Sequence, residues 1–284
     1  MELNEIEEIQ RKHKIVGRAK ELAAALACVR LNKNLLIEGP VGVGKTVLAL
    51  AVAHHLKRPF FRVDGDERYS EQKLTGWFDP PIVLAKGYEQ SAFIPGPLTL
   101  AMLESGLLFV NELNRMPESV QNVLLPSLDE RSLVIPKYGE ILALDGFTVI
   151  ATQNPREFVA TSHLSEALRD RFELITLEYQ KADEETEIVH LNLPADMEAK
   201  DETIREAVEI VRATRATPRI RRGASVRAAI SIVELSTRLP GPDSLRQAAH
   251  IALPTRIELA DDIHAPAAEV IDEIVESVKK KLSS

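Results

Sequence analysis

Residues 39–46, GPVGVGKT, have the residue types and spacing of a loop that binds phosphate groups. The glycines let successive backbone N–H groups turn toward phosphate oxygens, and the start of a following helix adds the positive end of its dipole. The ammonium of Lys45 can contact the β- and γ-phosphates, and the Thr46 hydroxyl can bind Mg²⁺. A glycine-rich turn that binds nothing is the alternative. The predicted nucleotide site consists of Gly39, Pro40, Val41, Gly42, Val43, Gly44, Lys45 and Thr46.

A second group with chemical potential follows the apolar residues 107–110, where Asn111 and Glu112 come directly after the run. In phosphate-transferring sites of this kind, one carboxylate steadies Mg²⁺ and a second orients and activates the attacking water. Glu112 has the position of that base. Asn111 stands where an aspartate is expected, and we assign it to the nucleotide site. The alternative is a buried strand that merely reaches solvent at these two residues.

The elements that must position these residues are short apolar runs alternating with helical patterns over the first 180 residues. Runs that are apolar throughout are typical of strands buried on both faces of a parallel sheet, so we predict a three-layer α/β domain. The predicted strands are 34–38, 60–64, 107–111, 148–152 and 173–177, and the predicted helices are 18–30, 45–56, 98–104 and 118–128.

After residue 180 the strand patterns disappear and helical patterns follow at 183–191, 201–215, 224–238, 243–253 and 267–281. We therefore predict a nucleotide-binding domain over residues 1–180 and a small all-helical domain over 181–284. Two segments of the first domain should project from the sheet. Residues 76–97 contain several prolines and predict a hairpin or a short helix, and residues 131–146 predict two short strands around a turn.

Composition narrows the classes of function. With 35 basic and 43 acidic residues the net charge is -8, which argues against a general binder of nucleic-acid backbones. The single cysteine, Cys28, and seven scattered histidines argue against disulfides and against a metal site built from side chains alone. The longest apolar runs have 7 or 8 residues, whereas a membrane span needs about 20. The first residues lack a secretory pattern, so we expect a cytoplasmic protein.

From residue 15 to the last helices the chain resembles the AAA+ ATPases, and within them the MoxR-type branch. NELNRMPESVQNVLLPSLDER (residues 111–131) is similar to the MoxR stretch after the second nucleotide motif. ATQNP resembles the end of the sensor-1 strand, in which Asn154 would be the sensor. LSEALRDRF resembles the arginine-finger segment, in which Arg171 would be the finger. GASVRA resembles the start of the sensor-2 helix, in which Arg227 would be the sensor arginine. The 76–97 projection matches the insert of this branch. RVDGDERYSEQKLTGWFDPP (residues 62–81) is most similar to MoxR proteins of carbon monoxide dehydrogenase maturation.

This resemblance implies that Glu112, Asn154, Arg171 and Arg227 are catalytic and that the cofactors are ATP and Mg²⁺. Each carried-over residue has a plainer alternative. Asn154 precedes a proline and could be a turn residue, the arginines could be ordinary surface residues, and Arg169 competes with Arg171 for the role of finger. The six arginines between residues 212 and 227 could grip nucleic acid or line the nucleotide cleft, and we favour the cleft.

The resemblance also implies a ring, expected as a hexamer, because an arginine finger acts on the neighbouring subunit's ATP. It further implies chaperone-like remodelling of a client, with a von Willebrand factor A-domain partner, and metal-cofactor insertion into an oxidoreductase as the specific version. Two alternatives stay open. One is a DNA-dependent motor or loader. The other is a slow, nucleotide-gated scaffold, which the asparagine at position 111 suggests.

Overall fold

The computed structural model describes residues 3–155 and 164–283. The chain forms two compact units, each considered by itself. The first unit comprises nearly all residues up to 178, and the second comprises residues from 179 onward together with 14–17 and 41–43. The predicted domain boundary at residue 180 stays a prediction. Among the described residues, every helix is too short or too polar to cross a membrane.

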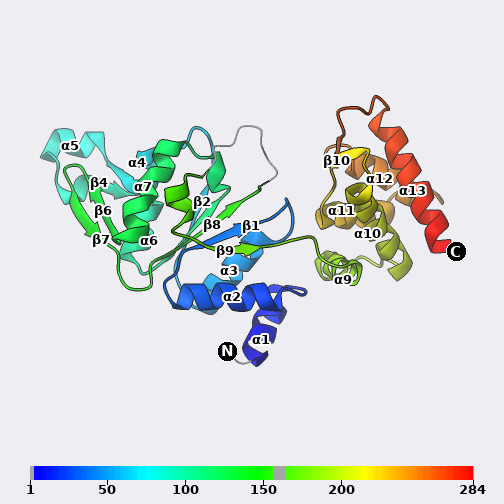
Figure 1. Cartoon of the computed structure of the whole chain (residues 1–284), viewed down its shortest axis with the longest axis horizontal. Coiled ribbons are helices and arrows are strands. Elements are labelled where there is room, and N and C mark those ends of the chain that lie inside the picture. The colour runs from blue at the N-terminus through cyan, green and yellow to red at the C-terminus, as the bar shows by residue number, and fades with distance from the viewer. Residues whose placement is uncertain (1–2, 156–163, 284) are drawn as a thin grey trace. The chain divides into compact units, whose positions relative to one another are not determined.

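A five-stranded parallel sheet forms the centre of the first unit, as the apolar runs predicted (Figure 1). Its strand order is β2-β5-β8-β1-β9, so strands far apart in sequence become neighbours. Because all the strands are parallel, their carboxyl ends meet at one edge of the sheet. The strands are β1 (Leu35–Glu38), β2 (Phe60–Asp64), β5 (Leu107–Asn111), β8 (Thr148–Gln153) and β9 (Glu173–Thr176).

Helices cover both faces of this sheet because both faces are apolar. Leu108 and Val110 belong to a core that includes residues of α6 and α7. Leu107 and Phe109 alternate with them and are equally buried, so they face the opposite side, where α2 and α3 pack. The three-layer α/β prediction is therefore confirmed. The helices are α2 (Ala19–Arg30), α3 (Lys45–His55), α6 (Pro97–Leu103) and α7 (Glu118–Asp129), preceded by α1 (Leu3–His13), which the sequence analysis did not predict.

Both predicted projections are present in the first unit. Residues 76–97 contain a hairpin and a helix together, rather than one or the other, because Pro80 and Pro81 occupy the first turn of α5, where proline is tolerated. Residues 131–146 form an antiparallel pair of strands. The elements are α4 (Glu71–Thr75), β3 (Gly76–Phe78), α5 (Pro80–Lys86), η1 (Gln90–Ala92), β4 (Phe93–Pro95), β6 (Ser132–Ile135) and β7 (Gly139–Leu142), with η2 (Leu113–Arg115) and α8 (Glu166–Arg169) elsewhere in the unit.

The second unit is helical and has an apolar core of its own. It also contains one feature that the all-helical prediction lacked, a two-stranded antiparallel ribbon. These strands have three and two residues, which is too short for a periodic sequence pattern. The elements are α9 (Ala182–Asn192), α10 (Asp201–Ala216), β10 (Ile220–Arg222), α11 (Val226–Ser236), α12 (Ser244–Ala252), β11 (Glu258–Leu259) and α13 (Ala267–Ser283).

Candidate nucleotide site

The predicted phosphate loop connects β1 to α3, the strand–loop–helix context that the motif requires. Gly42 and Gly44 have φ angles of 81° and 96°, a left-handed backbone that glycine adopts without strain. The Lys45 ammonium donates hydrogen bonds to the carbonyl oxygens of Gly39 at 2.6 Å and Pro40 at 2.9 Å. The loop therefore curls around a positive charge. Phosphate oxygens are stronger acceptors than these carbonyls, so the residues present fit a bound nucleotide.

Glu112 follows β5 in an unusual backbone conformation, with φ 55° and ψ 53°. Its N–H donates a hydrogen bond to the Thr152 hydroxyl at 2.9 Å, which fastens the end of β5 to β8. Its carboxylate accepts a hydrogen bond from Arg115 at 2.7 Å and is about one-third exposed. A partly exposed carboxylate on a fixed backbone has the properties that the predicted base requires.

Asn111 joins two neighbouring strands through its side chain. Its Nδ2 donates to Asp64 Oδ1 at 3.0 Å, and its Oδ1 accepts from the Thr152 hydroxyl at 3.1 Å. Arg62 donates to both Asp64 oxygens and, together with Asn111, lowers the pKa of that carboxyl below its usual value. We call the ends of β2, β5 and β8, with Asp64, Asn111, Glu112 and Thr152, the strand-end edge.

Asp64 was not among the residues predicted for the site. The sequence contains a pattern that could have indicated it, because Asp64 is the last residue of the predicted strand 60–64, just as Asn111 is the last residue of the predicted strand 107–111. What the sequence lacked was the pairing of β2 with β5, which sets Asp64 directly opposite Asn111. Polar residues that end adjacent parallel strands lie side by side, so they are candidates for one site.

Asn154 follows β8, the strand that lies between β1 and β5 in the sheet. Its side chain is buried, with 7% of the residue exposed. The sheet order thus brings the phosphate loop, Asn154 and Glu112 to the same edge. Asn154 has the position expected of a sensor between the loop and the base, and that role stays a prediction.

The two competing finger arginines differ in their surroundings. Arg171 Nε donates to Asp129 Oδ2 at 2.7 Å, and Nη1 donates to the Ala167 carbonyl. Arg169, the last residue of α8, is exposed and has no ion pair or side-chain hydrogen bond with the part of the chain that the structure describes. Both arginines belong to the first unit.

Five of the six arginines between residues 212 and 227 pair with carboxylates inside the second unit. Arg227, near the start of α11, is exposed and, within residues 3–155 and 164–283, is the one of the six without such a pair. It lies in the second unit, and its sensor role stays a prediction. The pairs are Arg212 and Arg215 with Glu185, Arg219 with Glu273, Arg221 with Glu258, and Arg222 with Glu258.

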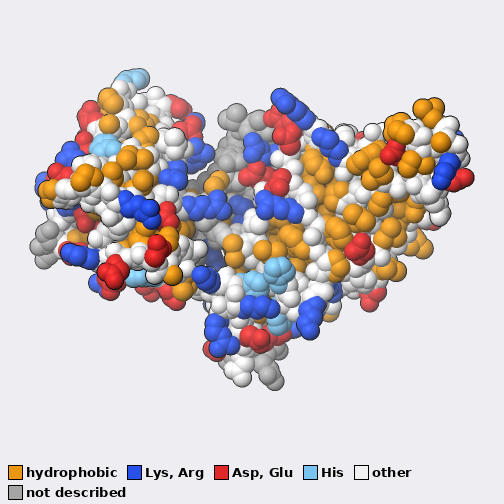
Figure 2. All heavy atoms as spheres, turned by 180° about the vertical axis from the view of Figure 1, so that it is seen from behind, with side chains coloured by type: hydrophobic (Ala, Val, Ile, Leu, Met, Phe, Trp, Pro, Cys, Tyr) orange, Lys and Arg blue, Asp and Glu red, His pale blue; other side chains and the backbone are white. Residues whose placement is uncertain are grey.

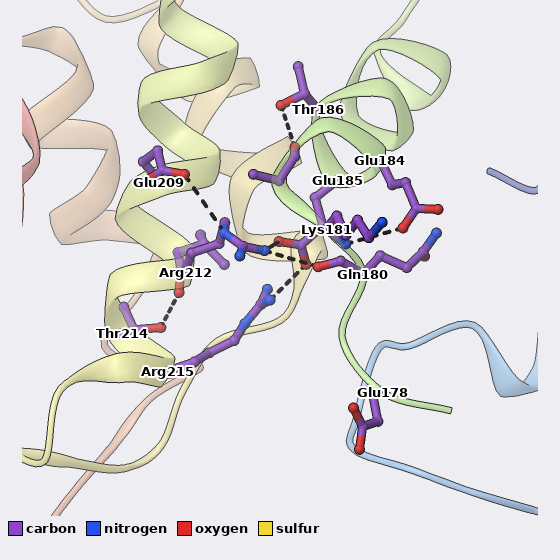
Figure 3. A network of polar contacts seen from close by, with 12 residues as sticks. Glu178, Gln180, Lys181, Glu184, Glu185, Thr186, Glu209, Arg212, Thr214 and Arg215 are labelled. Carbon is purple, nitrogen blue, oxygen red and sulfur yellow. Dashed lines mark hydrogen bonds and ion pairs between the residues drawn. The ribbon is translucent and has the colours of Figure 1, made fainter. Parts of the chain in front are cut away.

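Two of these arginines surround a buried acid, which Figure 3 shows from close by. Glu185 is 3% exposed and accepts from Arg215 at 2.7 Å and from Arg212 at 3.1 Å. Arg212 also donates to the Gln180 carbonyl, and the Arg215 guanidinium stacks 3.8 Å from the centre of the Tyr179 ring. We call Glu185, Arg212 and Arg215 the Glu185 cluster. Both oxygens of Glu185 are paired with these arginines, so the cluster links α9 to α10 within the second unit.

Comparison with known proteins gives consistent results. The pattern of the AAA domain (dynein-related subfamily) matches residues 34–172, which contain the phosphate loop and the strand-end edge. An uncharacterized protein of Staphylococcus epidermidis is 32% identical over 223 residues, which are 76% of this chain and 82% of that protein. An uncharacterized protein of Staphylococcus aureus is 31% identical over 219 residues, which are again 76% of this chain and 82% of that protein.

Solved structures share the fold. A candidate ATPase from Cytophaga hutchinsonii aligns with a TM-score of 0.54 and 23% identity, covering 96% of this chain and 94% of that one. A point mutant of Thermotoga maritima RuvB aligns with a TM-score of 0.56 and 18% identity, covering 84% of this chain and 71% of that one. The family match contains the nucleotide motifs in the positions where the structure places them. Residues 34–172 therefore form an AAA domain, the nucleotide-binding domain of ATP hydrolases that use ATP with Mg²⁺.

Proposed function

We propose that residues 39–46 bind the phosphates of ATP and that Glu112 activates the water that attacks them. The supporting observation is the strand order, which places the loop after β1, Asn154 after β8 and Glu112 after β5 on adjacent strands. Bound Mg²⁺ would neutralise phosphate charge, with the Thr46 hydroxyl as its ligand. Lys45 would hold the phosphates, Asn154 would sense the γ-phosphate, and Arg227 would act as the second sensor.

Replacing Lys45 tests the binding part of this proposal. Lys45→Ala should lower ATP affinity by more than about tenfold, because a charged hydrogen bond to phosphate contributes about 1.5–3 kcal/mol. Equilibrium titration with a fluorescent ATP analogue measures this loss. Lys33→Ala is the control, since Lys33 is an exposed lysine paired with Glu173. Equal affinity in the two variants would contradict the assignment of the phosphate loop.

We also propose a homo-oligomeric ring, expected as a hexamer, in which Arg171 acts on the ATP of the next subunit. The release of Arg171 from Asp129 would then accompany assembly.

Arg171→Ala should leave ATP binding unchanged and lower the turnover of the ring by about 10³–10⁵. Rings mixed from Arg171→Ala and Glu112→Gln subunits should regain activity, because some interfaces pair the two intact residues. If activity returns only in rings mixed from Arg169→Ala and Glu112→Gln subunits, Arg169 is the finger.

The finer proposal is a MoxR-type chaperone activity, in which ATP hydrolysis drives remodelling of a client protein with a von Willebrand factor A-domain partner. The resemblance of residues 62–81 suggests maturation of an oxidoreductase such as carbon monoxide dehydrogenase. The projections of the first unit support a protein client, because they expose apolar side chains. Figure 2 shows hydrophobic side chains gathered over this part of the first unit. The exposed apolar side chains of the projections include Trp77, Leu84, Tyr88, Val134 and Leu142.

A trapped ring tests for the client. A Glu112→Gln ring should capture the client with ATP and release it without ATP. Adding Leu84→Ser should abolish capture, since Leu84 is 89% exposed on α5. Leu31→Ser is the matched control, because Leu31 is 74% exposed at the end of α2. Recovery of an oxidoreductase subunit or an A-domain protein would support the proposal, and capture that depends on neither ATP nor Leu84 would contradict it.

The DNA-dependent alternative has weaker support. The RuvB structures show a shared fold, and the basic run 212–222 is paired with carboxylates of its own unit. A protein that grips phosphates needs cations that are available to them. ATPase activity that rises with added DNA at moderate salt would favour the motor over the chaperone.

A further inference from the structure

Asn111 departs from the acidic residue expected at the end of this strand, and its neighbours give a physical reason. The amide nitrogen faces Asp64, which can only accept hydrogen bonds, and the amide oxygen accepts the Thr152 hydroxyl proton. An aspartate at position 111 could accept from Thr152. It would have no proton to offer Asp64 and would place a second carboxylate about 3 Å from the first.

The contacts form a continuous chain across three strand ends. Arg62 donates to Asp64, Asn111 donates to Asp64, and Thr152 donates to Asn111. Thr152 in turn accepts the backbone N–H of Glu112 at 2.9 Å. Each hydroxyl and amide in the chain both gives and receives a hydrogen bond, so the direction of every bond is fixed by the carboxylate at Asp64.

The backbone also holds the two ends of this series of hydrogen bonds together, independently of the side chains. Gly65, the residue after Asp64, donates its N–H to the Asn111 carbonyl at 2.7 Å. A Cβ on Gly65 would lie 2.1 Å from the Glu112 carbonyl oxygen, so the residue after β2 lies directly against the backbone of Glu112. Glu112 has a left-handed backbone, which a non-glycine residue keeps only when its surroundings hold it there.

We propose that Asp64 is a positioning residue of the nucleotide site, which acts through Asn111 and Thr152 to fix the backbone of Glu112. This inference rests on the proposed role of Glu112 as the base. It explains why position 111 is an asparagine. The residue has to donate to Asp64 and accept from Thr152 at the same time, and aspartate cannot do both. The asparagine then belongs to an active hydrolase rather than to a slow scaffold.

The test exchanges the two residues. Asn111→Asp alone should lower kcat by about tenfold or more, since a small displacement of a catalytic group is costly, while ATP affinity stays within about threefold. The double variant Asp64→Asn with Asn111→Asp restores one donor and one acceptor between the strands with their order reversed. It should regain most of the kcat. Asp66→Asn is the control, because Asp66 is exposed in the same loop and its side chain accepts a hydrogen bond from the Arg68 N–H rather than from the strand-end edge.

A second readout uses the protein without nucleotide. Denaturant unfolding of the wild type, Asp64→Asn, Asn111→Asp and the double variant should show the same coupling between positions 64 and 111 as kcat shows, because the hydrogen bonds exist before ATP binds. If the single effects simply add in both measurements, the proposal is wrong. If they couple in unfolding but not in kcat, the contact is structural only and the proposal is equally wrong. Failure of the Lys45→Ala test would instead remove the proposed function itself.

Discussion

The strand-end edge and the Glu185 cluster are both built from carboxylates and their donors, but they differ in exposure. The side chains of Asp64 and Glu112 are 57% and 29% exposed, whereas that of Glu185 is 3% exposed. Exposed carboxylates keep free lone pairs that can exchange protein partners for water or a ligand. Buried ones need full pairing, because an unpaired buried charge is costly. The edge is therefore suited to chemistry and the cluster to stability.

Breaking the Glu185 cluster should give the largest effect on stability. Glu185→Ala leaves Arg212 and Arg215 without their shared carboxylate, and losing one partner of a buried ion pair costs about 3–5 kcal/mol. The free energy of unfolding, from denaturant titration, measures this loss. Glu258→Ala is the control, since Glu258 pairs with two arginines at an exposed site. If both variants lost the same free energy of unfolding, burial would not make the Glu185 cluster more important for stability than the exposed pairs of Glu258.

Crowding the strand-end edge should damage catalysis more than stability. In Gly65→Ala the new Cβ would push the Glu112 carbonyl, and we expect kcat to fall by about 10- to 100-fold while ATP affinity is largely kept. Gly106→Ala is the steric control at the other end of β5, where the Cβ would meet the Phe61 ring at 2.6 Å. It should lower stability and leave kcat nearly intact. A large loss of kcat in Gly106→Ala, with kcat kept in Gly65→Ala, would contradict the assignment of catalysis to the strand-end edge.

Acid should weaken a partly exposed ion pair of the second unit by a smaller amount. Arg246 and His250 lower the pKa of Asp272 from 3.8 to about 2. Because the folded-state pKa is the lower one, the contribution to stability is complete above about pH 4 and is lost as the pH falls toward 2. The difference in unfolding midpoint between the wild type and Asp272→Asn should therefore shrink over this range. A constant difference would show that the carboxylate charge is not what stabilises the pair.

The sequence predicted the parts of the site that are local in the chain. The phosphate loop is one contiguous motif, and the buried strands are contiguous apolar runs, so both could be recognised from residue order alone. Asn111 was recognised as a departure, but its partner Asp64 was not. Their contact joins residues 47 positions apart, and it depends on the order of strands in the sheet. The pairing of Arg171 with Asp129 is also non-local, and no periodicity indicates it.

Glu112→Gln tests the central claim most directly, because it changes one oxygen of the proposed base to an amide of the same size. The remaining oxygen can still accept from Arg115, so the fold and ATP affinity should be unchanged. ATP turnover in the presence of Mg²⁺ should fall by about 10²–10⁴, the usual contribution of a general base. Turnover close to that of the wild type, with ATP still bound, would show that another residue activates the water.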